Sequence, residues 1–66
     1  MRNQVMSTVT WDAISQFVQE RSLPAWYVRE IVRAEECDLS DEEVIALYSP
    51  GVAAATLAYR EWEGAV

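Results

Sequence analysis

The sequence of 66 residues contains no histidine, no lysine and a single cysteine, Cys37. Without histidine, the chain lacks the side chain that most often acts as a general acid or base near neutral pH. One cysteine allows neither an intramolecular disulfide nor a paired-cysteine metal motif, so we expect a reducing, cytoplasmic setting. No apolar run is long enough to span a bilayer, and we predict no membrane association.

The charge balance is acidic. Eleven Asp and Glu residues stand against five basic residues, all of them arginines, and the formal net charge is −6. Because phosphate binding depends on accumulated positive charge, we do not expect a general affinity for nucleic acid. A partner protein with a basic surface, including a surface that itself binds nucleic acid, is the more natural expectation.

Catalysis has little support in the sequence. The serines have no evident base, and Cys37 lies among Glu35, Glu36 and Asp38, whose negative charge disfavours the reactive thiolate. A chain this short has no room for both a core and a deep substrate cleft. We therefore predict that the protein is not an enzyme and that it has no cofactor.

Hydrophobic periodicity, interrupted by turn signals, predicts an all-α fold, a small compact bundle of about four short helices. The predicted helices cover approximately residues 11–22, 24–36, 41–48 and 50–63. Thr10 is expected to cap the first helix, and Pro24 is expected in the first turn of the second. Ser40 and Glu43 form a capping box for the third helix, and Ser49 followed by Pro50 marks the start of the fourth. Residues 1–9 are predicted to be a flexible segment before a single domain over 10–66.

The second predicted helix organises the chain because it has two distinct faces. Trp26, Arg29 and Arg33 share one face at spacings of three and four residues. Tryptophan and arginine are enriched in binding hot spots, but an exposed tryptophan beside arginines that pair with nearby carboxylates is also common. Exposure of this face would favour a contact surface. The apolar residues expected to face the core are Trp11, Ile14, Phe17 and Val18 of the first helix and Val28, Ile31 and Val32 of the second.

An acidic stretch links the second and third helices. Its spacing does not match a calcium loop, which needs regular oxygen donors and a glycine at its bend, so no metal site is predicted. Carboxylates are favoured in the first turn of a helix, and others solvate a loop, which explains much of the run. The other interpretation is a negative patch that meets a basic partner. The residues of this patch are Glu35, Glu36, Asp38, Asp41 and Glu42.

The fourth predicted helix is apolar on nearly all sides, with only Thr56, Arg60 and Glu61 clearly polar in its body. Such a helix is either central in a bundle or shared with another chain. Because a four-helix protein this small cannot surround one helix fully, we expect part of this surface, including Tyr59 and Trp62, to face a partner. A homo-oligomer held through residues 50–63 is one form of this expectation.

The first two predicted helices and their turn carry apolar residues at Phe17, Val18, Leu23, Val28 and Ile31. This spacing resembles the core of the helix-turn-helix family, which usually has alanine where Val18 stands and glycine where Ser22 stands. The resemblance implies that residues 24–33 form a DNA recognition helix. The side chains toward the groove would be Ala25, Trp26, Arg29 and Arg33.

These patterns predict a small acidic protein–protein interaction module, an inhibitor or regulator that occupies a basic surface of its partner. In size and charge the chain resembles small phage-type inhibitors of host defence. Two alternatives stay open: a helix-turn-helix DNA-binding regulator that uses helix 24–36, and a small structural subunit of a larger assembly. The predicted partner-binding residues are Trp26, Arg29, Arg33, Glu35, Glu36, Asp38, Asp41, Glu42, Tyr59 and Trp62.

Overall fold

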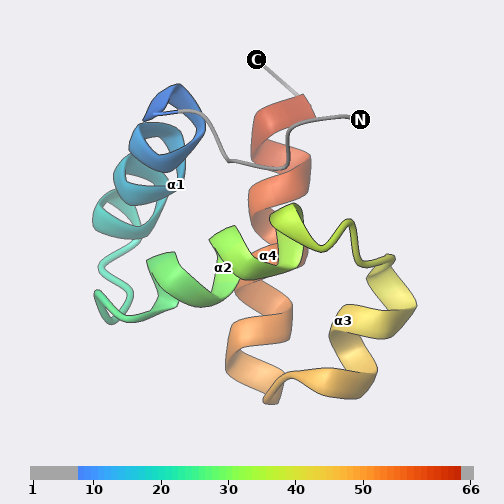
Figure 1. Cartoon of the computed structure of the whole chain (residues 1–66). Helices are drawn as coiled ribbons and strands as arrows, with labels where there is room; N and C mark the ends of the chain where they lie inside the picture. The colour runs from blue at the N-terminus through green and yellow to red at the C-terminus, as the bar shows by residue number, and fades with distance from the viewer. Residues whose placement is uncertain (1–7, 65–66) are drawn as a thin grey trace, which may run out of the picture.

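The structure, a computed structural model, describes residues 8–64. Four helices and no strand are found within this range (Figure 1), which confirms the predicted all-α bundle. They are α1 (Thr8–Glu20), α2 (Tyr27–Glu36), α3 (Asp41–Leu47) and α4 (Pro50–Gly64). None of the helices in the described range is long and apolar enough to cross a membrane.

The first helix begins earlier than expected. Residues 1–7 of the predicted flexible segment lie outside the described residues, whereas Thr8 and Val9 already belong to α1. Thr10, the predicted cap, therefore lies inside the helix. A cap residue has non-helical backbone angles, so the cap assignment of Thr10 is wrong. The weak helix propensity of threonine and valine does not prevent the first turn from forming here.

A hydrogen-bonded turn with one left-handed residue ends α1. Ser22 has a φ of 56°, and its N–H donates to the carbonyl of Gln19 at 3.1 Å. The N–H of Leu23 donates to the carbonyl of Val18 at 3.0 Å. This pair of bonds is a Schellman motif, in which the hydrophobic residue after the left-handed position packs back on the helix. Leu23 does so, against the main core.

The same motif ends α2. Asp38 has a φ of 56°, and its N–H donates to the carbonyl of Glu35 at 3.2 Å. The N–H of Leu39 donates to the carbonyl of Ala34 at 3.1 Å, and Leu39 packs against a second core cluster. Both helix ends thus place a non-glycine residue in a conformation that costs roughly 1–2 kcal/mol for most side chains and less for a short polar one.

The second helix starts three residues later than predicted. The Tyr27 N–H donates to the Pro24 carbonyl at 3.0 Å, and the Val28 N–H donates to the Ala25 carbonyl at 3.1 Å. Bonds between residues three apart are tighter than those of an α-helix. Pro24 therefore opens a turn, and Trp26 is the N-cap of α2, with no side-chain cap bond.

The starts of α3 and α4 follow the sequence signals. The Ser40 N–H donates to the Glu43 carboxylate at 2.8 Å, and the Glu43 N–H donates to the Ser40 hydroxyl at 3.1 Å. The predicted capping box is confirmed. At α4, the Val52 N–H donates to the Ser49 hydroxyl at 3.4 Å, and Pro50 is the first helical residue. Proline fits there because the N–H groups of the first helical turn have no acceptor within the helix, so the N–H that proline lacks is not needed.

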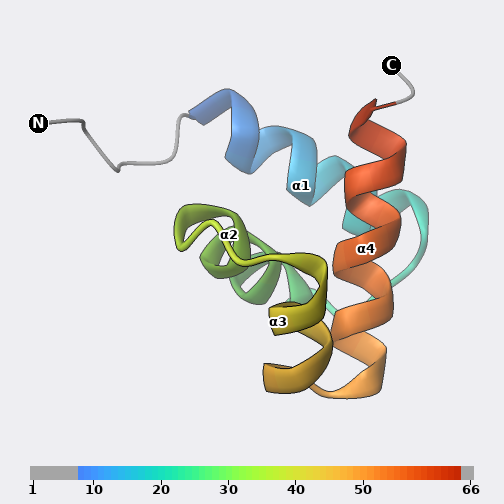
Figure 2. The ribbon, with the colours of Figure 1, turned by 90° about the vertical axis from the view of Figure 1, so that its right-hand side faces the viewer.

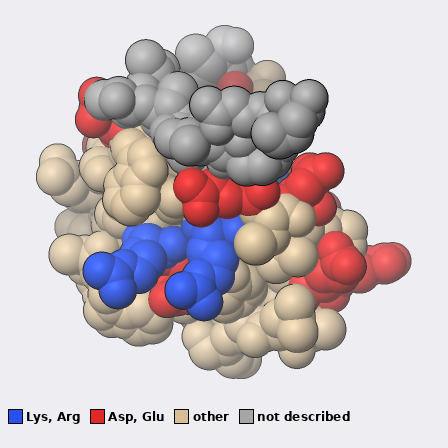
Figure 3. All heavy atoms as spheres, in the orientation of Figure 1, with Lys and Arg blue, Asp and Glu red and all other residues tan. Residues whose placement is uncertain are grey.

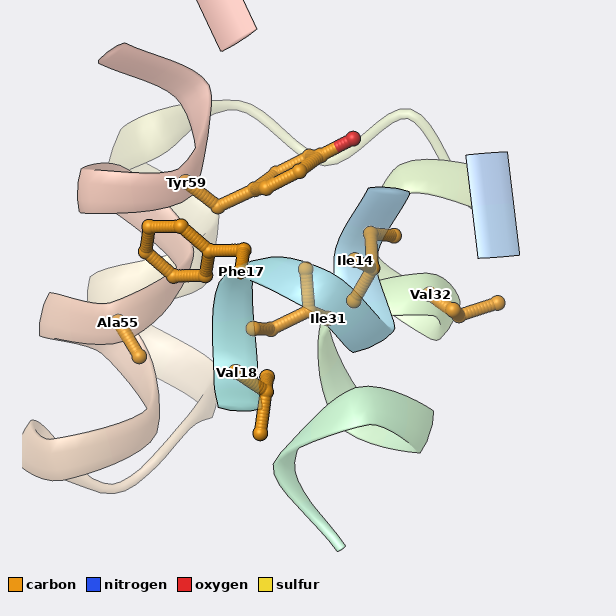
Figure 4. Close-up of a cluster of buried hydrophobic side chains, with 7 residues drawn as sticks. All are labelled: Ile14, Phe17, Val18, Ile31, Val32, Ala55 and Tyr59. Atoms are coloured by element: carbon orange, nitrogen blue, oxygen red, sulfur yellow. The ribbon is translucent and has the colours of Figure 1, made fainter. Parts of the chain in front are cut away.

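The main core lies where α1, α2 and α4 meet. Figures 1 and 2 show α2 crossing α4, with α1 on one side and the short α3 on the other. Fully burying one aliphatic or aromatic side chain contributes roughly 1.5–3 kcal/mol, so this cluster holds the three helices together. Its buried members, drawn in Figure 4, are Ile14, Phe17, Val18, Ile31, Val32, Ala55 and Tyr59. A second cluster of Ala34, Val44 and Ala53 attaches α3 to α2 and α4.

The predicted core residues are buried except Trp11, which is exposed, and Val28. Val28 is only half-buried, because it lies at the start of α2 where the surface is hollowed. The third helix buries Val44 alone and leaves Ile45 and Leu47 exposed, so α3 contributes little to the core.

Candidate interaction surface

The predicted Trp26/Arg29/Arg33 face is exposed to solvent. Trp26 is 58% exposed, and both arginines are exposed. Within residues 8–64 neither Arg29 nor Arg33 forms an ion pair, in contrast to the pairing that a purely structural role would use. Figure 3 shows basic side chains gathered over α2, with a small area of acidic atoms between them.

Beside this face lies an open hollow of about 500 Å³. Trp11 contributes from α1, which packs against α2. Trp11 is 40% exposed, so the prediction from apolar periodicity that Trp11 faces the core is wrong. The lining residues are Trp11, Ala25, Trp26, Val28, Arg29 and Glu30.

The ring of Trp26 is supported from beneath. It meets Tyr27 edge to face, with ring centroids 4.7 Å apart and an interplanar angle of 67°. Tyr27 packs against the main core and reaches the first turn of α4, where a Cβ added at Gly51 would lie 2.7 Å from the tyrosine hydroxyl oxygen. No real Cβ comes so close to a neighbouring atom, so a side chain at position 51 would force the end of Tyr27 to shift. Gly51 thus leaves space for the Tyr27 ring, and the Tyr27 ring in turn contacts Trp26.

Two of the predicted acidic-patch residues form ion pairs with Arg60 of the same chain. Arg60 Nε donates to Glu35 Oε2 at 2.9 Å, and Arg60 Nη1 donates to Asp41 Oδ1 at 2.6 Å. Arg60 Nη2 donates to the Leu39 carbonyl at 2.8 Å. The arginine thus ties α4 to the end of α2, the following loop and the start of α3. Burial lowers the pKa of Arg60, but the two carboxylates outweigh it and raise that pKa above its ordinary value.

The other three patch residues, Glu36, Asp38 and Glu42, are exposed. Figure 3 shows acidic side chains over the α2–α3 connection and α3, beside the basic area on α2. The left-handed turn that ends α2 sets the position of Asp38. In the described part of the chain, no group of three or more metal-ligating side chains comes together.

The aromatic residues of α4 belong to the core. Tyr59 is 1% exposed, and its ring meets Phe17 edge to face at 5.5 Å. Trp62 is half-buried and lies 5.5 Å from Phe17. Burial, with smaller contributions from Glu63 and Glu35, raises the pKa of Tyr59 to about 12. Tyr59 was predicted to contact a partner; the structure places it inside instead.

The apolar character of α4 follows from its central position. The helix supplies residues to both core clusters, which uses most of its apolar surface within the chain. Ala54 is the one exposed alanine, valine, leucine or aromatic residue between Val52 and Trp62 on this helix. Leu57, Ala58 and Trp62 are only half-buried, so the expectation that part of this helix faces a partner stays a prediction. The buried residues of α4 are Val52, Ala53, Ala55, Thr56 and Tyr59.

The α1–α2 turn has one feature in common with the helix-turn-helix family. Ser22 takes the left-handed conformation at the position where that family has glycine. Comparison with protein-family models, with curated proteins and with solved structures finds no match to this chain.

Proposed function

We propose that this protein is a protein–protein interaction module that binds its partner through the Trp26 surface, which we define as Trp11, Trp26, Arg29 and Arg33. One observation carries the proposal: two exposed tryptophans line a single hollow beside arginines that have no ion-pair partner in the described residues. Tryptophan and arginine are the residue types that contribute most to binding when a partner excludes water from them.

The support beneath this surface strengthens the proposal. Trp26 rests on Tyr27, and Tyr27 is held between the main core and α4. A side chain already held in place loses less conformational entropy when it binds. The hollow is open and lined mostly by apolar groups, which suits an inserted side chain of a protein better than an enclosed small molecule.

The test uses immobilised protein to capture partners from a cell lysate, with mass spectrometry to identify them. The bait variants are Trp26→Ala and a matched control, Ile45→Ala, because Ile45 on α3 is 59% exposed and lies outside the hollow. The expected result is a set of captured proteins that Trp26→Ala loses and Ile45→Ala keeps. Identical captured sets on both variants would contradict the proposal. Circular dichroism verifies that both variants are folded.

An inhibitor of a basic partner surface is a different form of the interaction, with a separate contact surface. Its exposed residues without an ion pair are Glu36, Asp38 and Glu42, since Glu35 and Asp41 bind Arg60. Reversing these three charges to lysine would abolish capture of such a partner. Capture that survives the reversal would leave the Trp26 surface as the contact and discard the acidic form.

A DNA-binding regulator is the second candidate, supported by the left-handed Ser22 in the α1–α2 turn and by the exposed Arg29 and Arg33 on α2. Mobility shift at low salt with random duplex DNA tests it, since non-specific binding is strongest there. A shift that Arg29→Ala/Arg33→Ala removes would support this candidate. Absence of any shift at micromolar protein would eliminate it.

A further inference from the structure

The arginines of the described residues fall into two groups. Arg60 is bonded to two carboxylates, and Arg21 lies over the Phe17 ring with its guanidinium carbon 4.7 Å from the ring centroid. Arg29 and Arg33 have no such partner, although acidic residues outnumber basic ones by eleven to five in the chain. Their positive charge is therefore available on the surface that also carries the exposed tryptophans.

We infer that the partner segment bound by the Trp26 surface is acidic, with an apolar side chain in the hollow and two carboxylates on Arg29 and Arg33. This inference rests on the proposed function and names the chemistry of the partner. Charge complementarity supports it, because Arg29 lines the hollow with Glu30 as the one acidic residue of the lining, and the exposed Arg33 follows four residues later on α2. Arginine and carboxylate pair through parallel hydrogen bonds, which add geometric specificity.

The spacing along α2 sets the order of groups in the partner. A helix rises about 1.5 Å per residue, so Arg29 lies about 4.5 Å and Arg33 about 10.5 Å beyond Trp26 along the axis. The two arginines are therefore about 6 Å apart in this direction. Carboxylates two residues apart in an extended segment, or four apart in a helical one, match this separation. Both acids must lie on one side of the apolar anchor.

Duplex DNA also carries negative charge, but the surroundings of this surface oppose it. The end of α2 and the next loop present Glu36 and Asp38, both exposed. Duplex DNA carries one charge per roughly 1.7 Å along its axis, so it would meet these carboxylates as well as the arginines. A short acidic peptide can avoid them. The observations thus favour a peptide, and DNA binding is one outcome of the test.

The test selects binders from a displayed library of random peptides on the immobilised wild-type protein, followed by affinity measurement of the enriched peptides. Three variants are compared. Trp26→Ala removes the anchor contact, and Arg29→Gln/Arg33→Gln removes two positive charges. Ala46→Glu/Ala54→Glu is the control, because it changes the net charge by the same amount at exposed positions on α3 and α4.

The expected peptides combine an aromatic or aliphatic residue with Asp or Glu on one side of it. Their affinity falls at least tenfold on Trp26→Ala and on Arg29→Gln/Arg33→Gln, and less than threefold on the control. Peptides in which lysine replaces the acids regain affinity for Arg29→Glu/Arg33→Glu. This recovery depends on direct pairing, so a general loss of structure cannot produce it.

The two proposals fail in different ways. Peptides that depend on Trp26 but bind the double glutamine variant as well as the wild type would overturn the acidic partner and leave the proposed function standing. Peptides that bind Trp26→Ala as tightly as the wild type, or no enrichment at all, would overturn both. If random duplex DNA displaces the peptides and binds directly in a way that needs both arginines, the ligand of this surface is DNA and the acidic peptide is overturned.

Discussion

Replacement of Gly51 by alanine is expected to destabilise the protein only while Tyr27 keeps its hydroxyl. In a helix, alanine is more favourable than glycine by up to about 1 kcal/mol. Here the new Cβ would lie 2.7 Å from the tyrosine oxygen, so the half-buried Tyr27 ring, which packs on the core, must move. Such overpacking costs roughly 1–3 kcal/mol. We therefore expect Gly51→Ala to lower the free energy of unfolding by about 1 kcal/mol.

Tyr27→Phe removes the atom that causes the clash. The next atom of the ring, Cζ, lies 3.8 Å from the added Cβ, which is an ordinary contact distance. In this background Gly51→Ala should raise the free energy of unfolding by about 0.5 kcal/mol, because only the helix preference remains. The double-mutant coupling should therefore be about 1.5 kcal/mol, within the range seen for residues in contact.

Urea denaturation of the four proteins, followed by circular dichroism, measures this coupling. A change of 1 kcal/mol shifts the melting temperature of so small a domain by roughly 4–8 °C, so thermal scans give an independent check. Additive effects, with a coupling below about 0.3 kcal/mol, would refute the packing of Tyr27 on Gly51. The support that this packing provides to Trp26 would then also be refuted.

Three further predictions follow from helix ends, the arginine contacts and the buried tyrosine. Arg60→Met should lower the free energy of unfolding by about 2 kcal/mol, because it leaves two carboxylates and a carbonyl without their donor. Arg33→Met, the matched control, should change this free energy by less than about 0.5 kcal/mol. Equal effects of the two variants in urea denaturation would contradict the assigned contacts. Tyr59 keeps its proton in the folded protein up to a pKa of about 12, while in the unfolded chain it titrates near its ordinary value of 10. Stability should therefore fall above the lower of these values, by about 1.4 kcal/mol per pH unit from this residue, and a pH series on Tyr59→Phe should lack that part of the slope. Ser22→Gly and Asp38→Gly should each raise the free energy of unfolding by about 0.5–1 kcal/mol, since glycine has no steric penalty at positive φ. A lower melting temperature for either variant would show that the side chain stabilises the helix end more than the backbone strain costs.

Several features of this fold are readable from neighbouring residues alone. The capping box at Ser40 and Glu43 and the Ser49–Pro50 start of α4 depend on groups three residues apart, so sequence spacing predicts them. The helical spacing of Trp26, Arg29 and Arg33 is equally local. Their exposure needs one further condition, namely that no other helix covers α2 on that side.

Other features depend on residues that are far apart in the chain. Arg60 meets Glu35 across 25 positions, so no local pattern could show that Glu35 and Asp41 were occupied. Trp11 satisfies the apolar spacing of α1, yet it lies at the edge of the contact with α2 and lines the hollow. A spacing rule identifies which side of a helix is apolar, but it does not show where the neighbouring helix ends.

The left-handed helix ends lie between these two cases. Glycine usually marks such a position, and neither Ser22 nor Asp38 gives that signal. The leucine that follows each of them was the available clue, because a hydrophobic residue after the left-handed position packs back on its helix.

Sequence alone determined the all-α class, the approximate helices and the aromatic and basic face of α2, because hydrophobic period, caps and charge are properties of neighbouring residues. The tertiary structure alone decided which of the candidate residues remain on the surface. It buried Tyr59 beside Phe17, used Glu35 and Asp41 to hold Arg60, and brought Trp11 beside Trp26. Each of these results depends on how separate helices pack, and packing joins residues that the sequence keeps apart.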